Sequence, residues 1–252
     1  MKLITLNIWG GQVYEPLTGF IKEQSNFVDI FCFQEVFNKI VGKSIPLAEK
    51  YLPQARPKIY SEIQEILSGY KGYLAPAQDQ FGLATFVREN INVIETGDFF
   101  VFKERDSWVL GTANTLGRNV QYVKFKINGK DFLIANLHGI WTGKGKDDTA
   151  ERIIQSEKIR DFFKNQTGAK ILCGDFNLWP YTKSMAILEK DMINLVKNYK
   201  ITSTRSSLYT RFSDKKDRFA DYILVSKDVR VKDFKVLPNE VSDHLPLFLE
   251  FS

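Results

Sequence analysis

Both histidines of the chain lie in short polar motifs of a kind that can act on a phosphoester. His138 stands two residues after Asn136, and His244 ends the triplet Ser242-Asp243-His244. The sequence of 252 residues contains 2 histidines, so its whole histidine supply lies in these motifs. A histidine near carboxylates can move a proton or donate a hydrogen bond to an anion at neutral pH. The two motifs therefore predict an enzyme.

Other polar side chains follow short apolar runs. Asn7 follows the run at 3–6, Glu35 closely follows 30–33, and both Asp175 and Asn177 follow 171–174. Asp221 opens a further apolar run. Such runs indicate buried strands, so the polar residues at their ends are expected to gather along one rim of a sheet, where sites in layered folds are commonly built.

Hydrolysis of a phosphoester by water needs a cation on the phosphoryl oxygens, a group that orients and deprotonates the water, and help for the leaving oxygen. Glu35 can bind Mg²⁺ as a hard carboxylate, with Asn7 and Asp243 in support. Asp175 and Asn177 are two residues apart and would point the same way if the strand continues through them, which would place a water-orienting carboxylate beside an amide donor for phosphate.

The histidines complete this set of groups. An imidazole held by a carboxylate stays cationic more readily, which is a role for His244 if Asp221 reaches it. His138 can hydrogen-bond the phosphate or protonate the leaving group. Each of these residues alone has a simpler interpretation as a turn, surface or structural residue. Six polar sites at strand ends in this order are harder to assign to turns together.

The chain resembles the endonuclease/exonuclease/phosphatase superfamily over nearly its whole length. The motifs that carry the resemblance are Leu6-Asn7, Gln34-Glu35, Asn136-x-His138, Gly174-Asp175-Phe176-Asn177, Asp221-Tyr222 and Ser242-Asp243-His244. The resemblance implies an α/β fold, a four-layered α/β sandwich of two packed, mostly antiparallel mixed β-sheets flanked by helices. It also implies a Mg²⁺-dependent phosphoesterase site at one edge, with Mn²⁺ as a possible substitute.

The resemblance also implies a role for each motif residue. The counterpart of Glu35 binds the metal, with those of Asn7 and Asp243 close to it. The counterpart of Asp175 orients or activates the water, and that of Asn177 contacts the phosphate. The counterpart of His244, paired with that of Asp221, contacts the scissile phosphate. Either the aspartate or the histidine can take the proton of the water, and we assign this role to Asp175.

The branch of the superfamily is less well defined by these residues. Abasic-site endonucleases usually carry tyrosine where this chain has His138, so the histidine favours the branch of deoxyribonucleases, tyrosyl-DNA phosphodiesterases, neutral sphingomyelinases and inositol-phosphate phosphatases. The secreted deoxyribonucleases generally have a signal peptide and a disulfide, and this sequence shows neither. The opening 6–10 is similar to sphingomyelinases, but no membrane-anchoring helix or apolar hairpin is evident.

We expect one domain over residues 1–252, since a sandwich of this length can share a single core. The patterning predicts strands near 2–8, 29–34, 81–88, 91–101, 119–127, 131–137, 170–174, 221–226, 229–236 and 246–251. It predicts helices at 16–27, 56–68, 148–164 and 182–189, and a hairpin turn at Asn128-Gly129.

Composition and cysteine usage predict a soluble, monomeric protein of the cytoplasm. The formal charge of +5 and the pI near 9.0 suit a phosphate-bearing substrate, although spread lysines can equally form a solvated surface. Cys32 and Cys173 lie in apolar strands, which favours buried thiols over a disulfide. No leader segment and no apolar run long enough to span a bilayer is evident, so stable membrane insertion is not expected.

Substrate contacts are expected from the long irregular stretches at 104–117, 139–147 and 203–219 and from residues beside the motifs. Trp9 and Trp179 directly follow motif segments, and Trp141 lies in a polar loop, so their indoles can stack on a base. Arg118, at the start of a strand that runs toward the site region, matches an arginine often found in the superfamily, and it can either bind phosphate or be a surface arginine. The loops also carry Trp108, Arg105, Lys144, Lys146, Arg205, Arg211 and Arg218.

The sequence is compatible with three functions. The leading hypothesis is a Mg²⁺-dependent phosphodiesterase that acts on nucleic acid, as a nuclease or at a damaged or blocked end. The first alternative is a phosphatase or phosphodiesterase for a small metabolite or lipid headgroup. The second alternative is a binding module without catalysis, which would have no need for Asp175 and Glu35 together.

Overall fold

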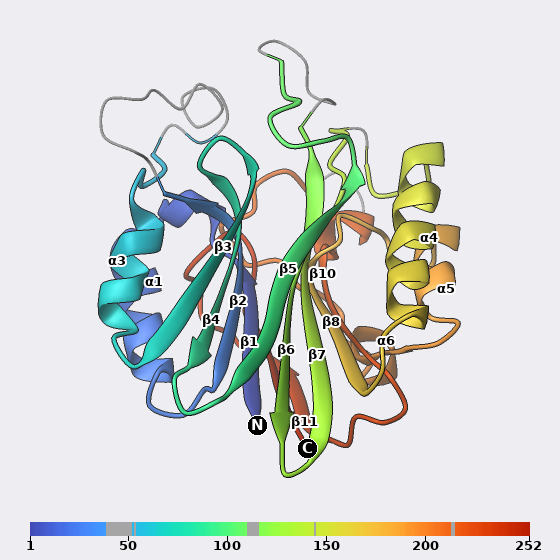
Figure 1. The fold of residues 1–252 in the computed structure, drawn as a ribbon. Coiled ribbons are helices and arrows are strands. Elements are labelled where there is room, and N and C mark those ends of the chain that lie inside the picture. The colour runs from blue at the N-terminus through green and yellow to red at the C-terminus, as the bar shows by residue number, and fades with distance from the viewer. Residues whose placement is uncertain (39–51, 53, 110–115, 144, 213–214) are drawn as a thin grey trace.

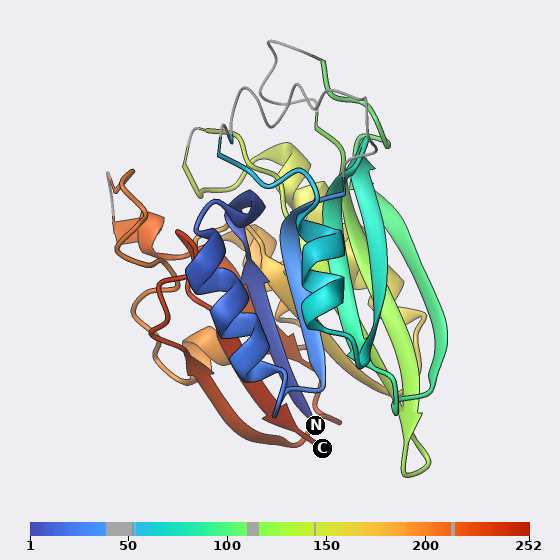
Figure 2. The same ribbon diagram turned by 90° about the vertical axis from the view of Figure 1, so that its left-hand side faces the viewer.

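The computed structural model describes residues 1–252 except 39–51, 53, 110–115, 144 and 213–214. Two six-stranded sheets pack face to face, and helices cover the outer face of each sheet (Figures 1 and 2). This arrangement is the four-layered α/β sandwich that the sequence predicts. Both chain termini lie at the same end of the sandwich in Figure 1.

The first sheet combines strands from the two ends of the chain. Its order is β11-β12-β1-β2-β4-β3, in which β1 and β2 are parallel and every other pair is antiparallel. The strands are β1 (Lys2–Asn7), β2 (Ile30–Phe37), β3 (Tyr70–Gln78), β4 (Phe81–Arg88), β11 (Val231–Val236) and β12 (Leu247–Phe251).

The second sheet has the order β5-β6-β7-β8-β10-β9, and again holds one parallel pair, β7 with β8. Its strands are β5 (Val93–Phe102), β6 (Arg118–Ile127), β7 (Lys130–His138), β8 (Ala169–Asp175), β9 (Ile193–Asn194) and β10 (Asp221–Val225). The turn between β6 and β7 is formed by Asn128 and Gly129, whose φ angles are 50° and 78°. The predicted hairpin is confirmed, because two positive φ angles are what such a tight turn requires.

The helices divide between the two outer faces. Helices α1 (Tyr14–Gln24) and α3 (Ile59–Ile66) cover the first sheet, and α4 (Ala150–Lys164), α5 (Lys183–Leu188) and α6 (Leu195–Asn198) lie beside the second (Figure 1). Short 3₁₀ turns occur at η1 (Trp9–Gly11) and η2 (Lys215–Arg218). Thr149 caps α4 by accepting a hydrogen bond from the backbone N–H of Arg152. Among the helices that the structure describes, none has both the length and the apolar character needed to cross a membrane.

The predicted elements are present with ends shifted by a few residues, but strands β3 and β9 were missed. Gly72 and Pro76 lie within β3, and both residues weaken a strand signal. The strand forms because it is at the edge of its sheet, where the missing N–H of a proline breaks no ladder on the open side. Strand β9 has only two residues, too few for a pattern.

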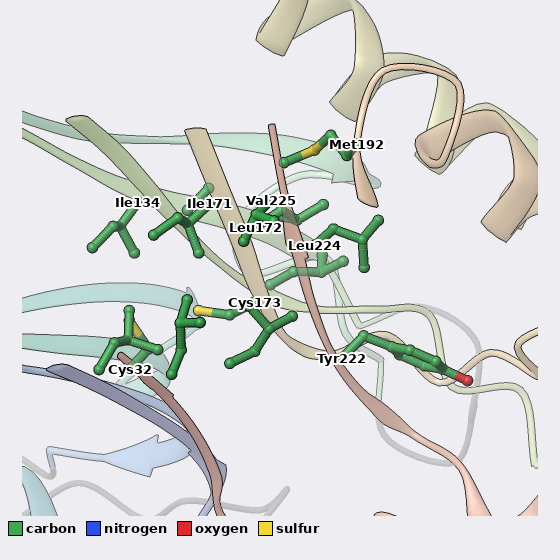
Figure 3. Packing of buried hydrophobic residues seen from close by; sticks show 14 of the residues in the cluster. Cys32, Ile134, Ile171, Leu172, Cys173, Met192, Tyr222, Leu224 and Val225 are labelled. Carbon is green, nitrogen blue, oxygen red and sulfur yellow. The ribbon is translucent and has the colours of Figure 1, made fainter. Parts of the chain in front are cut away.

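The two parallel strand pairs face each other across the centre of the sandwich, with β1 and β2 against β7 and β8. On β1, Leu3 faces this inter-sheet core, whereas Ile4 and Leu6 pack under the helices of the first sheet. The alternation of a strand therefore directs Asn7 between the sheets. Cys32 and Cys173 are buried free thiols in the same core, as predicted (Figure 3).

A pair of buried amides bridges the two sheets directly below the rim. Nε2 of Gln34 donates to Oδ1 of Asn136 at 2.6 Å. Nδ2 of Asn136 donates to the carbonyl oxygens of Phe33 at 3.0 Å and Ala84 at 3.3 Å. Asn136 is thus bonded to two strands of the opposite sheet, and it fixes how the second sheet sits against the first.

We expect Asn136→Ala to lower the free energy of unfolding by about 2–4 kcal/mol, because it leaves several buried polar groups without partners. Urea denaturation measures this change. Asn26→Ala is the matched control: its amide bonds only to the Glu23 carbonyl in an exposed turn, so a change within about 0.5 kcal/mol is expected. Equal effects of the two substitutions would show that the amide bridge contributes nothing particular.

Candidate active site

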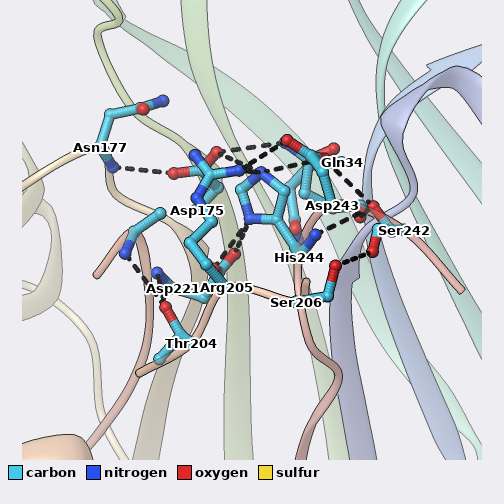
Figure 4. Close-up of polar contacts among 12 residues, drawn as sticks. Gln34, Asp175, Asn177, Thr204, Arg205, Ser206, Asp221, Ser242, Asp243 and His244 are labelled. Atoms are coloured by element: carbon cyan, nitrogen blue, oxygen red, sulfur yellow. Dashed lines mark hydrogen bonds and ion pairs between the residues drawn. The ribbon is translucent and has the colours of Figure 1, made fainter. Parts of the chain in front are cut away.

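The predicted catalytic and metal-binding residues meet at one end of the sandwich, opposite the chain termini. Asn7 and His138 end β1 and β7, Asp175 ends β8, and Asp221 begins β10. In the antiparallel pairing of β8 with β10, Asp221 lies opposite Asp175. Asp243 and His244 come just before β12, and Glu35 lies in β2. Figure 4 shows Asp175, Asp221, Asp243 and His244 converging from these different elements.

Asn7 connects two of the carboxylates. Its Nδ2 donates to Oε1 of Glu35 and to Oδ2 of Asp175, both at 3.1 Å. Its Oδ1 accepts from the backbone N–H of Trp9 at 2.9 Å, which fixes the orientation of the amide. One side chain of the first sheet therefore holds carboxylates from both sheets in a single group.

The backbone is unusual at two residues of the site. Glu35 has a φ of 58° and Asn177 a φ of 53°, conformations that residues other than glycine seldom adopt and that cluster at functional sites. The pairing of β2 with β4 shifts register between Phe33 and Val36. Such a bulge re-aims a side chain, and here it directs Glu35 to the same side as Gln34.

Gly174 makes room for the turn that carries Asp175. Its φ is 129°, and a Cβ there would lie 2.1 Å from the carbonyl oxygen of Leu137. The backbone N–H of Asn177 then donates to Oδ1 of Asp175 at 2.9 Å. The Gly-Asp-Phe-Asn motif therefore builds a turn in which the carboxylate of Asp175 is fixed by its own backbone.

His244 is held between two carboxylates and an arginine. Its Nδ1 lies 2.8 Å from Oδ2 of Asp221, and its Nε2 lies 3.7 Å from Oδ2 of Asp175. Nη1 of Arg205 donates to Nε2 of His244 at 2.5 Å and to Oδ2 of Asp243 at 2.9 Å. In this arrangement the ring proton is on Nδ1 and faces Asp221.

His138 approaches the same carboxylates from β7. Its Nε2 lies 3.7 Å from Oε1 of Glu35 and 3.8 Å from Oδ2 of Asp175. Burial lowers the pKa of His138 well below its usual range, and the charge of Arg118 lowers it further. At neutral pH the imidazole is therefore neutral and offers one N–H donor.

Burial and neighbouring charges also shift the carboxyl groups. Burial raises the pKa of Glu35, and the charges of Asp243 and Asp175 act in the same direction. Burial opposes ionisation of Asp175 as well, but electrostatic attraction by His244 and Lys146 outweighs it and holds the pKa of Asp175 below its usual range. Asp175 is therefore ionised at neutral pH, whereas a bound cation would favour the ionised form of Glu35.

Three buried cations surround these carboxylates. Arg118 opens β6, Lys146 lies between β7 and α4, and Arg205 lies between α6 and β10, with exposed fractions of 7%, 5% and 8%. Burial lowers the pKa of Lys146 to about 8 and that of Arg118 to about 10. Nζ of Lys146 donates to Oδ1 of Asn177 at 2.9 Å.

A buried guanidinium orders the loop that carries Lys146. Arg152 on α4 is 1% exposed and donates to the carbonyl oxygens of Ile140, Gly145 and Asp147. The backbone N–H of Trp179 donates to the carbonyl of Lys146 at 2.9 Å. The loop after β7 is thus tied both to α4 and to the loop after β8.

The site opens into a cavity of about 390 Å³. Its lining combines the charged groups with Trp9, Trp108 and Trp141. Trp179 is not among the lining residues, and its ring packs against Tyr181 and Phe219 instead.

Only some of the loop residues that were predicted to contact substrate line the cavity. Lys146, Arg205 and Arg211 line the cavity. Arg105 pairs with Asp98 on β5, away from that lining. Arg218 ends η2 and is likewise not among the lining residues. Lys144 lies outside the residues that the structure describes.

The sequence marked 203–219 as a stretch for substrate contacts, but it did not predict that Thr204 and Ser206 would brace Asp221 and His244. Oγ1 of Thr204 accepts from the backbone N–H groups of Ala220 and Asp221, and Oγ of Ser206 donates to the carbonyl of Ser242 at 2.6 Å. These residues come from a stretch with no apolar pattern, so no signal in the sequence could have placed them. Arg205 lies between them and is held rigidly as a result.

One carboxylate oxygen has the character of a metal ligand. Oε2 of Glu35 is buried and has no hydrogen-bond partner within the described chain. A buried anionic oxygen without a donor is costly, and a divalent cation would satisfy it. Asp175, Asp221 and His244 form a second group whose potential ligand atoms lie within 4.8 Å of one another. Both groups contain oxygen ligands that suit a hard cation.

Comparisons with known proteins agree with this geometry. The model of the Endonuclease/Exonuclease/phosphatase family matches residues 4–244. A UPF0294 protein of Klebsiella pneumoniae (strain 342) is 28% identical over 125 residues, which are 48% of this chain and 42% of that protein. The match therefore spans less than half the length of that relative.

Solved structures show the same fold. The mannosyl-6-phosphatase of Bacteroides thetaiotaomicron VPI-5482 superposes with a TM-score of 0.72 at 21% identity, covering 100% of this chain and 99% of that chain. A humanized D. rerio TDP2 with 14 mutations superposes with a TM-score of 0.67 at 14% identity, covering 100% and 98%.

We expect Glu35→Gln to weaken binding of Mg²⁺ or Mn²⁺ by about tenfold or more, because it removes the charge of the unpartnered carboxylate. The measurement is the rise in melting temperature with metal concentration. Glu157→Gln, an exposed change on α4, is the control and should retain the full rise. If Glu35→Gln retains it while Asp221→Asn loses it, the cation belongs to the group of Asp175, Asp221 and His244.

Proposed function

Since the chain belongs to the Endonuclease/Exonuclease/phosphatase family, we propose that it hydrolyses phosphoester bonds at unpaired ends of nucleic acid. Members of this family are hydrolases that act on phosphoester bonds and generally depend on a divalent metal. The observation that carries the proposal is the position of Asp175. Its ionised carboxylate is held by Asn7, lies near both histidines, and borders the unpartnered oxygen of Glu35.

Glu35, with Asn7 and Asp243 beside it, would hold the cation, for which Mg²⁺ is the expected ion and Mn²⁺ the substitute. When bound there, the cation would offset negative charge on the phosphoryl oxygens. We favour this group over that of Asp175, Asp221 and His244. Both oxygens of Asp221 already contact Nδ1 of His244, so this carboxylate is engaged in orienting the imidazole.

Asp175 is the proposed partner of the attacking water. Its Oδ1 is fixed by the backbone N–H of Asn177, and its Oδ2 by the amide of Asn7. A carboxylate held in this way accepts a hydrogen bond from water in a defined direction and can take its proton. The depressed pKa keeps Asp175 ionised throughout the neutral range, so its carboxylate is available to accept a hydrogen bond from the water.

Donors on the remaining sides of the site are proposed to bind the phosphoryl group. The amide of Asn177 and the neutral imidazole of His138 each supply an N–H group. His244, oriented by Asp221, would contact the scissile phosphate. Donors fixed before the substrate arrives need no reorganisation when charge develops in the transition state. These donors would therefore stabilise the negative charge that develops on the phosphoryl oxygens in the transition state.

The walls of the cavity support a nucleic-acid end as substrate. Trp9 and Trp141 line the cavity beside the charged floor, and base stacking on an aromatic ring is worth about 1–3 kcal/mol. Arg118 lies at the floor and can contact phosphate. The net charge of +5 raises the local concentration of a polyanion. An unpaired end can place one base and one phosphate in such a cavity.

A small phosphorylated metabolite is the second candidate. The cavity of about 390 Å³ is within the range of small-molecule sites, roughly 300–1,000 Å³. The bond attacked and the groups that attack it would be the same. The two substrates differ in how many phosphates contact the protein, and hence in their response to salt.

We expect end-labelled single-stranded oligonucleotides to be processed in the presence of Mg²⁺, with Asp175→Asn reducing the rate by about 10²-fold or more. The assay follows labelled products over time, beside supercoiled plasmid as an unbroken substrate. The rate should fall steeply between 50 and 200 mM salt, as for ligands with several phosphate contacts, on the order of 10-fold or more. A flat salt profile, or no turnover of any end, would favour the small metabolite.

A further inference from the structure

We infer that the phosphoester cleaved at this site is a terminal phosphate, a phosphate monoester, rather than an internal diester. The inference rests on the proposed function and names the substrate class of the same site. The observation behind it is the supply of unused N–H donors on Arg118, Lys146 and Arg205. All three side chains line the cavity that contains Asp175.

Arg118 has the largest number of N–H donors without a described acceptor. Within the part of the chain that the structure describes, its guanidinium makes no hydrogen bond or ion pair, although the residue is only 7% exposed. The guanidinium carries five N–H donors in a fixed fork that matches the spacing of phosphate oxygens. Glu35 and Asp175 act on it as nearby charges, so it lies close to the reacting centre.

Lys146 and Arg205 add donors from two other directions. Nζ of Lys146 donates to Oδ1 of Asn177, and its two other N–H groups have no described acceptor. Nη1 of Arg205 is engaged with Asp243 and His244, but the buried Nε has no described partner. The guanidinium stacks over the Tyr209 ring at 4.1 Å, which holds Nε in place.

Nε of Arg205 is buried without an acceptor, and the side chains of Arg118 and Lys146 line the same cavity. Because an unpaired buried donor is costly, this set of donors points to a ligand rich in acceptors. A diester offers two unesterified oxygens that share one negative charge. A monoester offers three strong acceptor oxygens and about −1.5 to −2 charge at pH 7. Three cations from three elements fit the monoester, because each free oxygen can receive a charged donor.

The reaction is balanced without a further reagent. The oxygen of water forms a bond to phosphorus while the ester P–O bond breaks. The leaving oxygen keeps the bonding electron pair and takes a proton, so the products are a free hydroxyl on the end and inorganic phosphate. Inorganic phosphate should therefore bind the site as a product.

The test is calorimetric titration with inorganic phosphate and with dimethyl phosphate, at saturating Mg²⁺ and pH 7.5. Wild-type protein should bind phosphate at least about tenfold more tightly than dimethyl phosphate. Arg118→Met and Lys146→Met should each weaken phosphate binding by about tenfold and reduce the preference over dimethyl phosphate. Arg160→Met, a surface change on α4 whose arginine pairs with Asp191, should leave both affinities unchanged.

Two further measurements keep the result interpretable. Thermal unfolding confirms that each variant is folded, and Lys146→Arg, which keeps the charge, should retain most of the phosphate affinity. Equal affinity of wild type for the two probes, or equal weakening of both probes in the variants, would overturn the inference. Preference for phosphate without turnover of any nucleic-acid end would uphold it and refute the proposed nucleic-acid substrate.

Discussion

The hydrogen bond between Gln34 and Asn136 is the contact on which the site depends. It joins the two sheets one residue before Glu35 and two residues before His138. Because Asn136 also binds two carbonyl groups of the first sheet, sliding one sheet against the other would leave buried groups unpaired. Residues from separate parts of the chain therefore meet at fixed distances at the rim, as catalysis by positioned groups requires.

Above this bridge the protein concentrates opposite charges in a small buried volume. The carboxylates of Glu35 and Asp175 lie near the side chains of Arg118, Lys146 and Arg205. Within the described chain, no ion pair joins either carboxylate to one of these three cations. Burying charge in this way costs stability. The positive φ angles of Glu35 and Asn177 add strain. Both costs are concentrated around the site, which is expected where groups are held ready for a ligand rather than for folding.

Much of this arrangement follows from local sequence patterns. Asn7, Glu35 and Asp175 each follow an apolar run, and because strand ends share a rim, their meeting could be predicted. Strand β3 could not, since Pro76 is tolerated only through its edge position. The contact of Arg205 with Asp243 and His244 could not be predicted from the sequence either. It depends on the way Thr204 and Ser206 brace their segment, a tertiary effect with no periodic signal.

The most direct test of the account is hydrolysis of an activated aryl phosphoester, p-nitrophenyl phosphate, by wild type and Asp175→Asn, each with Mg²⁺ and with EDTA. The small substrate requires only the reacting centre, whatever the natural leaving group is. We expect the wild type to release p-nitrophenol with Mg²⁺, and we expect this release to be lost in Asp175→Asn or in the presence of EDTA. Turnover that survives both Asp175→Asn and EDTA would contradict the account.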